Sequence, residues 1–133
     1  MGNPAANKSS MVQAIDIHIV MVPTPGGPVP TPLPHPFVGQ MNSALSSSVT
    51  IAGEAAAMVD SIAKNQPQHI ATPPGTSFQN PPANEGSVMM GSMTVKINGQ
   101  FAARLGDTVT TCNDPVDAPV GSVITGAPTV MIG

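Results

Sequence analysis

The chain has 133 residues, enough for one small domain, and a net charge of −3. Its four basic residues are too few for the clustered Lys and Arg of a nucleic-acid interface, which excludes nucleic acid as a partner. No apolar run approaches the ~20 residues of a membrane-spanning helix, and a single cysteine excludes an internal disulfide.

The aliphatic side chains are mostly β-branched, with 14 Val and 9 Ile against 3 Leu, which favours strands over helices. Sixteen Pro and 13 Gly predict frequent turns, whereas Trp and Tyr are absent and only three Phe are present. A disordered Pro-rich interaction segment is the alternative, but charged residues make up only 8%, unlike typical disordered chains. We expect a folded β-rich domain whose small core needs an additional stabilising cross-link.

In chain order, residues 1–13 are expected to form a flexible N-terminus, and residues 1–10 lack the apolar stretch of a secretory signal. Residues 15–21 alternate as a strand does, with three isoleucines on one face and Asp16 and His18 on the other. Residues 23–36 hold seven prolines and are predicted to be extended and polyproline-like, wrapping the surface rather than pairing in a sheet.

The middle of the chain is less regular. Residues 37–48 are expected to be a polar connection with room for a short turn of helix, and residues 65–86 and 108–119 to be loops. Residues 54–64 have helical propensity, but an internal repeat favours a returning hairpin arm at 54–57.

That repeat centres on Asn98-Gly99, which predicts a type I′ hairpin turn because both residues need positive φ. The twelve residues from Gly86 and the twelve from Gly121 share G-S-V-x-x-G-x-x-T-V-x-I, seven identities at an offset of 35. A looser copy begins at Ser48. Three copies predict a pseudo-threefold body, against the alternative that small-residue hairpins resemble one another by chance.

The candidate chemical site consists of all three histidines and the one cysteine: His18, His35, His69 and Cys112. Three imidazoles and a thiolate make a complete tetrahedral set for zinc. Their spacings of 17, 34 and 43 residues match no local zinc motif, so the fold would have to bring them together. In the alternative interpretation the histidines are solvated and Cys112 is a small buried hydrophobe.

An enzyme is not expected. No G-x-S-x-G, P-loop or H-E-x-x-H pattern occurs, and four protein ligands would leave no open position on a metal. Cys112 lies among Thr and Asp, which do not lower the pKa of a thiol, so a Cys–His nucleophile pair is disfavoured. The nearby aspartates do not have EF-hand spacing and are interpreted as turn formers.

Residues 99–107, G-Q-F-A-A-R-L-G-D, resemble the signature of the PAAR-repeat proteins, in which a Pro-Ala-Ala-Arg run is followed by Gly-Asp. The flanking V-x-I-N-G, the G-x-x-T-V-x-I repeats and the proline-rich run at 22–36 resemble the same family. Phe101 stands where the proline usually stands, which marks a divergent, PAAR-like member. The resemblance predicts that residues 14–133 form the domain.

The resemblance implies an all-β cone of repeated hairpins with pseudo-threefold character, Pro/Gly-rich loops and a structural metal near its apex. That metal is zinc, or iron, held by His18, His35, His69 and Cys112. The implied function is a piercing tip that caps and sharpens the trimeric, VgrG-like spike of a contractile injection system such as type VI secretion. The tip would sit as a monomer on the trimer and contact the target membrane transiently.

Two further functions are open at this stage: a zinc-dependent adaptor that docks effectors to the spike, and a small zinc hydrolase. The resemblance also implies a place in the bacterial cytoplasm during assembly, and later at the tip of the injection particle or in the target cell. Since neither end of the sequence leaves room for an effector domain, a plain tip is expected.

Overall fold

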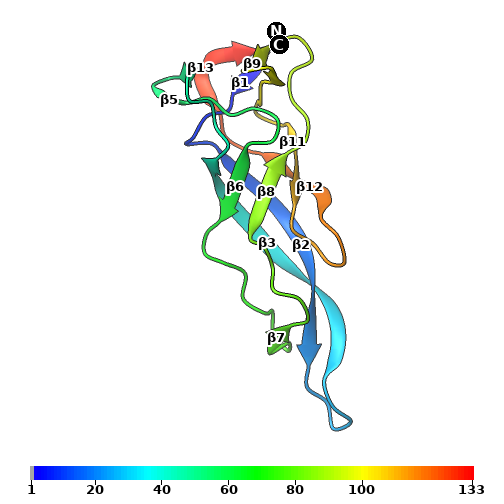
Figure 1. The fold of residues 1–133 in the computed structure, drawn as a ribbon. Helices are drawn as coiled ribbons and strands as arrows, with labels where there is room; N and C mark the ends of the chain where they lie inside the picture. The colour runs from blue at the N-terminus through cyan, green and yellow to red at the C-terminus, as the bar shows by residue number, and fades with distance from the viewer. Residues whose placement is uncertain (1) are drawn as a thin grey trace.

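The computed structural model describes residues 2–133, and over that range it consists of strands and turns without a helix (Figure 1). It therefore offers no apolar helix of membrane-spanning length within those residues. The predicted all-β class is confirmed. The strands are β1 (Asn3–Ala5), β2 (Met11–Val22), β3 (Val29–Ser43), β4 (Thr50–Ile51), β5 (Glu54–Ala55), β6 (Ile62–Asn65), β7 (Ser77–Phe78), β8 (Glu85–Val88), β9 (Lys96–Ile97), β10 (Gln100–Phe101), β11 (Thr108–Thr111), β12 (Ala118–Val123) and β13 (Ala127–Ile132).

Six strands close into a small barrel. The main sheet has the order β12-β11-β8-β6-β3-β2-β7, and β12 also pairs with β2, so the sheet returns to its first strand. Closure removes the free edges that an open sheet of this size would expose. The interior is filled by small and medium side chains, which include Val12, Phe37, Met41, Val88, Val109 and Val123.

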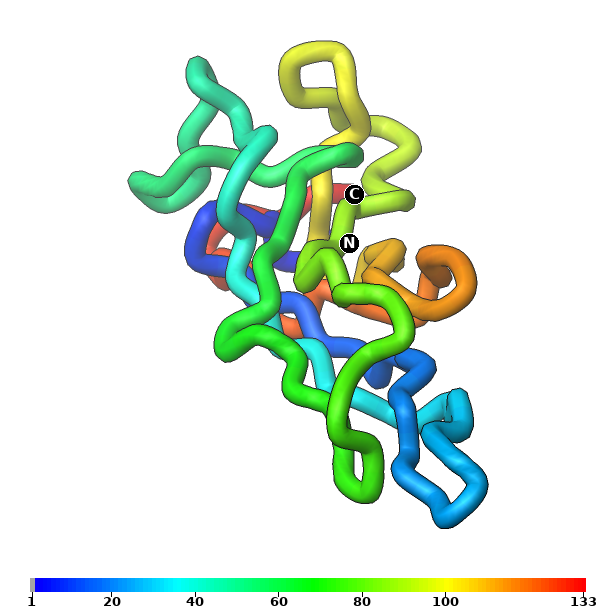
Figure 2. The backbone as a smooth tube through the Cα atoms, turned by 60° about the horizontal axis from the view of Figure 1, so that its bottom comes forward, coloured from blue at the N-terminus to red at the C-terminus, as the bar shows by residue number. Residues whose placement is uncertain are grey.

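The barrel is made of three similar units, each a strand, a hairpin and a returning strand. The first runs β3, β4–β5, β6, and the second runs β8, β9–β10, β11. The third runs β12, β13–β1, β2, so its hairpin is assembled from the two ends of the chain. Both termini accordingly lie together at one end of the molecule in Figure 1, and they remain close together in the turned view of Figure 2. The predicted pseudo-threefold character is confirmed.

The two continuous hairpins turn as the repeat predicts. Asn98 and Gly99 have φ of 52° and 83°, and Ala52 and Gly53 have 52° and 84°. Positive φ at both central positions is the type I′ geometry that suits tight hairpins. Residues 54–57 therefore begin the returning arm of a hairpin and not a helix, as the internal repeat predicted.

Three alanines close one end of the barrel through a ring of backbone hydrogen bonds. The amide of Ala6 donates to the carbonyl of Ala103 (2.9 Å), that of Ala103 to Ala57 (3.1 Å), and that of Ala57 back to Ala6 (3.0 Å). All three residues are fully buried. Only a small side chain fits where three backbones converge this closely, which explains the repeated Ala-Ala pairs. We call this end, with its three hairpins, the base.

The N-terminal segment, expected to be flexible, is built into the base. β1 pairs with β13, and Ala5 and Ala6 are buried. The expected boundary between residues 13 and 14 falls inside β2, which begins at Met11. The segment looked unstructured because its partner lies at the opposite end of the sequence. It supplies Pro4-Ala5-Ala6, the counterpart of Phe101-Ala102-Ala103, so the proline missing at position 101 is found in the third unit.

The prediction that the proline-rich segment avoids the sheet is wrong. It is extended, but residues 29–36 form the first half of β3 and pair with β2 in continuous antiparallel register. Pro30, Pro32, Pro34 and Pro36 alternate with residues that bond to β2, so no ladder hydrogen bond is lost. The polar connection with a turn of helix expected from residue 37 is also wrong up to Ser43, where β3 ends.

The strand predicted at 15–21 is confirmed within β2. Its polar face is buried, however, and its isoleucine face is partly exposed to solvent. Asp16 and His18 are buried, whereas the side chains of Ile15 and Ile17 are 56% and 38% exposed. The β2–β3 hairpin continues past the barrel to a turn at residues 23–28, which we call the apex (Figure 1). The buried polar face of β2 thus lies between barrel and apex.

Candidate metal centre

Five side chains from four parts of the fold converge where the barrel ends and the apical hairpin begins. Asp16 and His18 project from β2, and His35 from β3. His69 lies in the loop after β6, and Cys112 follows β11 directly. They come from two strands of the barrel and from two segments that follow other barrel strands, so only barrel closure brings residues 16 to 112 to one point.

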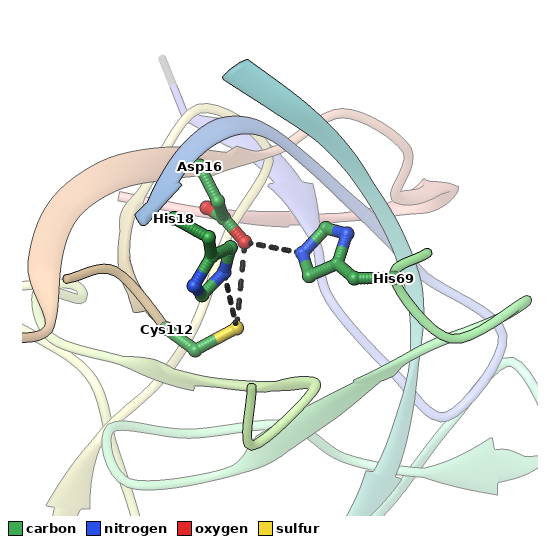
Figure 3. A group of neighbouring side chains, drawn as sticks. All are labelled: Asp16, His18, His69 and Cys112. Carbon is green, nitrogen blue, oxygen red and sulfur yellow. Dashed lines mark hydrogen bonds and ion pairs between the residues drawn. The ribbon is translucent and has the colours of Figure 1, made fainter. Parts of the chain in front are cut away.

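Four of these side chains form a tight, buried group, shown in Figure 3: Asp16, His18, His69 and Cys112. One ligand atom from each lies within 4.8 Å of all the others. Cys112 Sγ is 3.7 Å from His18 Nε2 and 3.5 Å from Asp16 Oδ2, and the ring Nε2 of His69 is 2.9 Å from the same carboxylate oxygen.

His35 lies at the edge of this group. Its ring centroid is 5.5 Å from that of His18 and 5.6 Å from that of His69, which are themselves 4.9 Å apart. Its Nε2 accepts the backbone N–H of Thr72 at 3.1 Å, and its Nδ1 donates to the carbonyl of Leu33 at 2.9 Å. In this arrangement Asp16, not His35, is the fourth member of the tight group.

The spacing of the three histidine rings is nonetheless compatible with one shared metal ion. Two imidazoles bound tetrahedrally to one zinc, with Zn–N of about 2.0–2.1 Å, have centroids about 5 Å apart. All three pairs of histidine rings are within 0.6 Å of that separation (4.9–5.6 Å).

A second layer of polar groups holds the cluster. Asp16 also accepts from the hydroxyl of Thr111 and, at 3.4 Å, from the amide of Asn113. Buried His18 Nδ1 makes no hydrogen bond, and Asp114 Oδ2 lies 3.4 Å from it. In zinc sites, an imidazole that binds the metal with one nitrogen commonly has a carboxylate beside its other nitrogen, which orients the ring and makes it a stronger ligand. The ring of Phe78 covers the cluster on the apical side, and its centroid lies 5.3 Å from the centroid of the His35 ring.

The electrostatics of the group depend strongly on its occupant. Burial lowers the pKa of His18 and of His35, which keeps both rings neutral and therefore able to bind a metal. Burial, reinforced by Asp16, raises the pKa of Cys112 to about 11, so the thiol is protonated at neutral pH without a cation. A divalent cation reverses this preference because it binds the thiolate.

The donor set fits zinc: imidazole nitrogens, a thiolate and a carboxylate are its common protein ligands. Sequence reasoning selected the histidines and the cysteine but omitted Asp16. Its signal was present in the Asp-x-His spacing, which places both side chains on one face of a strand.

Comparison with known proteins gives one match. The family model described as PAAR motif matches residues 79–133, which contain β8 to β13, that is, the second unit and the first half of the third. No curated protein and no solved structure matches the chain.

The matched segment contains the F-A-A-R-L-G-D run and the second hairpin of the base. The PAAR motif indicates a spike-tip protein of contractile injection systems, a structural rather than an enzymatic family, and the all-β fold of three hairpin units agrees with it. The predicted resemblance to the PAAR-repeat proteins is thus confirmed by the family-model match over residues 79–133.

Proposed function

We propose that this chain caps the blunt end of a threefold-symmetric spike, as one subunit on three chains, and presents its apex forward. The observation that carries the proposal is the alanine ring of the base, in which the same backbone contact is made three times around one axis. A single chain with threefold pseudosymmetry can offer the same surface to each subunit of a trimer. An asymmetric chain could satisfy only one of the three.

The side chains around that axis support the proposal. The V-x-I copies place Ile51, Ile97 and Ile132 inward, where they form a second small core with the alanines. Val49 and Val95, two residues before the first two of these isoleucines, are exposed at the base. The base therefore presents repeated apolar contacts, which suit a permanent interface better than an open water-facing surface.

We also propose that zinc, bound by His18, His35, His69 and Cys112, fastens the apical half. Asp16 then has an electrostatic role: with a Cys112 thiolate and a doubly charged cation, its carboxylate brings the buried charge to zero. Charge balance matters because an uncompensated charge in this buried site is costly. When bound, the metal would supply the cross-link between β2, β3 and two loops that a core so poor in aromatic residues does not provide.

The test of capping is stoichiometry. Mixed with the trimeric spike protein of its own injection system, the chain should form a complex of one tip and three spike chains by native mass spectrometry. Val95→Glu at the base should weaken that complex at least tenfold, whereas Val29→Glu near the apex, matched in chemistry, should leave it unchanged. A three-to-three complex, or equal effects of both variants, would contradict the proposal.

The test of the metal is elemental analysis of purified protein, which also distinguishes zinc from iron. One ion per chain is expected, lost in His35→Ala and in Cys112→Ala and retained, with weaker affinity, in Asp16→Asn. Full metal content in His35→Ala together with its loss in Asp16→Asn would instead assign the fourth ligand to Asp16.

A further inference from the structure

Two asparagines close the long loop that carries His69. Asn65 is the last residue of β6, Asn84 precedes β8, and both are buried. The backbone N–H of Asn65 donates to the carbonyl of Asn84 at 2.8 Å, and the side-chain amide of Asn65 donates to Asn84 Oδ1 at 3.1 Å. Asn65 Oδ1 in turn accepts the N–H of Val38 at 2.9 Å. The two ends of the loop are therefore fixed to each other and to β3.

Asn84 holds His69 through its side chain. Its Oδ1 also accepts the backbone N–H of His69 at 2.8 Å, while the ring Nε2 of His69 lies 2.9 Å from Asp16 Oδ2. The histidine is thus held at its backbone by one residue and at its ring by another. Loop closure does not need the bond from His69, because the backbone pair between Asn65 and Asn84 already closes the loop.

The backbone of Asn84 faces a second member of the cluster, Cys112. The cysteine follows Thr111, which pairs with Gly86 of β8, so the residues just before Gly86 lie beside it. Burial raises the pKa of the Cys112 thiol, and hydrogen bonds from the backbone N–H groups of Asn84 and Glu85 to its sulfur act in the opposite direction. Such bonds stabilise the thiolate, which is the form that binds a metal.

The backbone conformation of Asn84 allows both contacts. Its φ is 58°, in the left-handed region that asparagine tolerates better than most side chains. A left-handed residue can turn successive backbone N–H groups toward one side, as in the nests that bind anions. The repeat does not require asparagine here, because Pro119 stands at the equivalent position two residues before Gly121. The choice of residue is therefore specific to the side of the barrel that carries the cluster.

We propose that Asn84 is a positioning residue of the metal centre: its side chain places His69, and its backbone N–H, with that of Glu85, supports the sulfur of Cys112. The inference rests on the proposed zinc centre and adds to it a residue that contacts two ligands without being one. Two ligands from separate loops are thereby set in place before the ion arrives, so less ordering has to accompany binding.

Asn84→Gly tests the side chain separately from the backbone, because glycine keeps both the N–H and the freedom to adopt positive φ. Zinc affinity, measured by competition with a chromophoric chelator, should fall roughly 10–100-fold. Asn84→Asp keeps an acceptor for the N–H of His69 and should recover most of that loss. Asn80→Gly, the same substitution at an exposed position of the same loop, should leave the affinity unchanged.

The hydrogen bonds to sulfur are tested on the unaltered protein, so this measurement does not depend on how well a variant folds. With an NMR-active cadmium isotope in place of zinc, the amide protons of Asn84 and Glu85 should show scalar coupling to the metal, transmitted through the sulfur of Cys112. The amide proton of Gly86, the next residue of β8, should show none.

Four results would overturn the inference: unchanged zinc affinity in Asn84→Gly, equal losses in Asn84→Gly and Asn80→Gly, no recovery in Asn84→Asp, or no coupling at Asn84 and Glu85. In each case the proposed zinc centre would stand as long as the unaltered chain holds its ion. If the unaltered chain binds neither zinc nor cadmium, the proposed centre fails and the inference fails with it.

Discussion

The base and the apex of this molecule close the two ends of one barrel by opposite means. At the base, one backbone contact is repeated three times and the side chains are reduced to alanine. At the apical end, five polar side chains of three chemical types meet once, and they come from β2, β3 and two loops. A repeated sequence can build the first closure because every copy contributes the same group. The second needs different groups at one point, so it breaks the repeat.

The difference also separates the sources of stability. The base depends on packing and hydrogen bonds that exist in any solution condition. The apical cluster depends on an occupant, because neutral histidines and a protonated thiol contribute little by themselves. Variants at the two ends should therefore respond differently to metal, to side-chain volume and to pH.

The largest effect is expected from loss of the metal. Cys112→Ser should lower the free energy of unfolding by roughly 4 kcal/mol or more, about 15 °C in Tm. Hydrogen exchange should accelerate first in residues 66–84 and 112–117, while the alanine ring stays protected. Gln79→Ala, an exposed change in the same loop, serves as the control. Uniform acceleration, base included, would show that the two ends do not separate.

The base should respond to volume alone. Ala57→Leu places a larger side chain where three backbones meet and should cost about 1–3 kcal/mol through overpacking. Metal content should be unchanged. Ala83→Leu, at an exposed loop position, should stay within about 0.5 kcal/mol. Both quantities come from urea unfolding with elemental analysis of the same samples, and an unaffected Ala57→Leu would refute close packing at the axis.

The pH dependence of the metal-free protein should come from the apical end. The folded-state pKa of His18 and of His35 lies below 6.5, so folding binds fewer protons and stability falls as pH drops below 6.5. The pKa of Cys112 rises from 9.0 to about 11, so its contribution is complete below pH 9 and is lost between pH 9 and 11. That loss is about 2–3 kcal/mol.

Maximum stability of the metal-free chain is thus expected between pH 6.5 and 9. Urea titrations at a series of pH values measure it. Cys112→Ser should remove the alkaline decline, whereas Ala57→Leu should lower the whole curve without changing its shape. An alkaline decline that persists in Cys112→Ser would exclude the thiol as its cause.

The smallest effect concerns the turns that follow the alanines at the base. Asp107 accepts the N–H of Arg104 at 2.7 Å and also pairs with its guanidinium at 2.8 Å. In the other two units a serine hydroxyl, Ser10 or Ser61, accepts the equivalent N–H at 3.0 Å. The same backbone turn is therefore closed by a carboxylate in one unit and by a serine hydroxyl in the other two.

Asp107→Ala should cost about 1–2 kcal/mol because it removes the acceptor, and Asp107→Ser should recover about half, since a serine suffices in the other units. Chemical denaturation of both variants gives the comparison. If serine restores nothing, the ion pair with Arg104, and not the capped N–H, closes the turn.

Much of the base could be predicted from sequence because its information is local and repeated. Asn98-Gly99 predicts its own turn, and the matched copies predict that the same hairpin recurs. The third hairpin was missed because Pro4-Ala5-Ala6 and β13 lie at opposite ends of the chain. A repeat that is divided between the termini leaves only half its pattern at each end.

The proline-rich segment was misassigned for a different reason. Proline argues against a central strand, and only the register shows that all four prolines of the strand's first half fall on its unpaired edge. Periodicity likewise identified the strand at 15–21 but did not determine which of its two faces is buried. Polar residues are buried there because other polar residues meet them.

The sequence by itself determined the strand-rich class, the tight hairpins, the threefold repetition and the types of residue able to bind a metal. These depend on backbone preferences and side-chain chemistry that act over a few residues. Only the tertiary structure decided that the chain's two ends complete one hairpin and that Asp16 joins the histidines. Those facts depend on which distant strands the closed barrel places side by side.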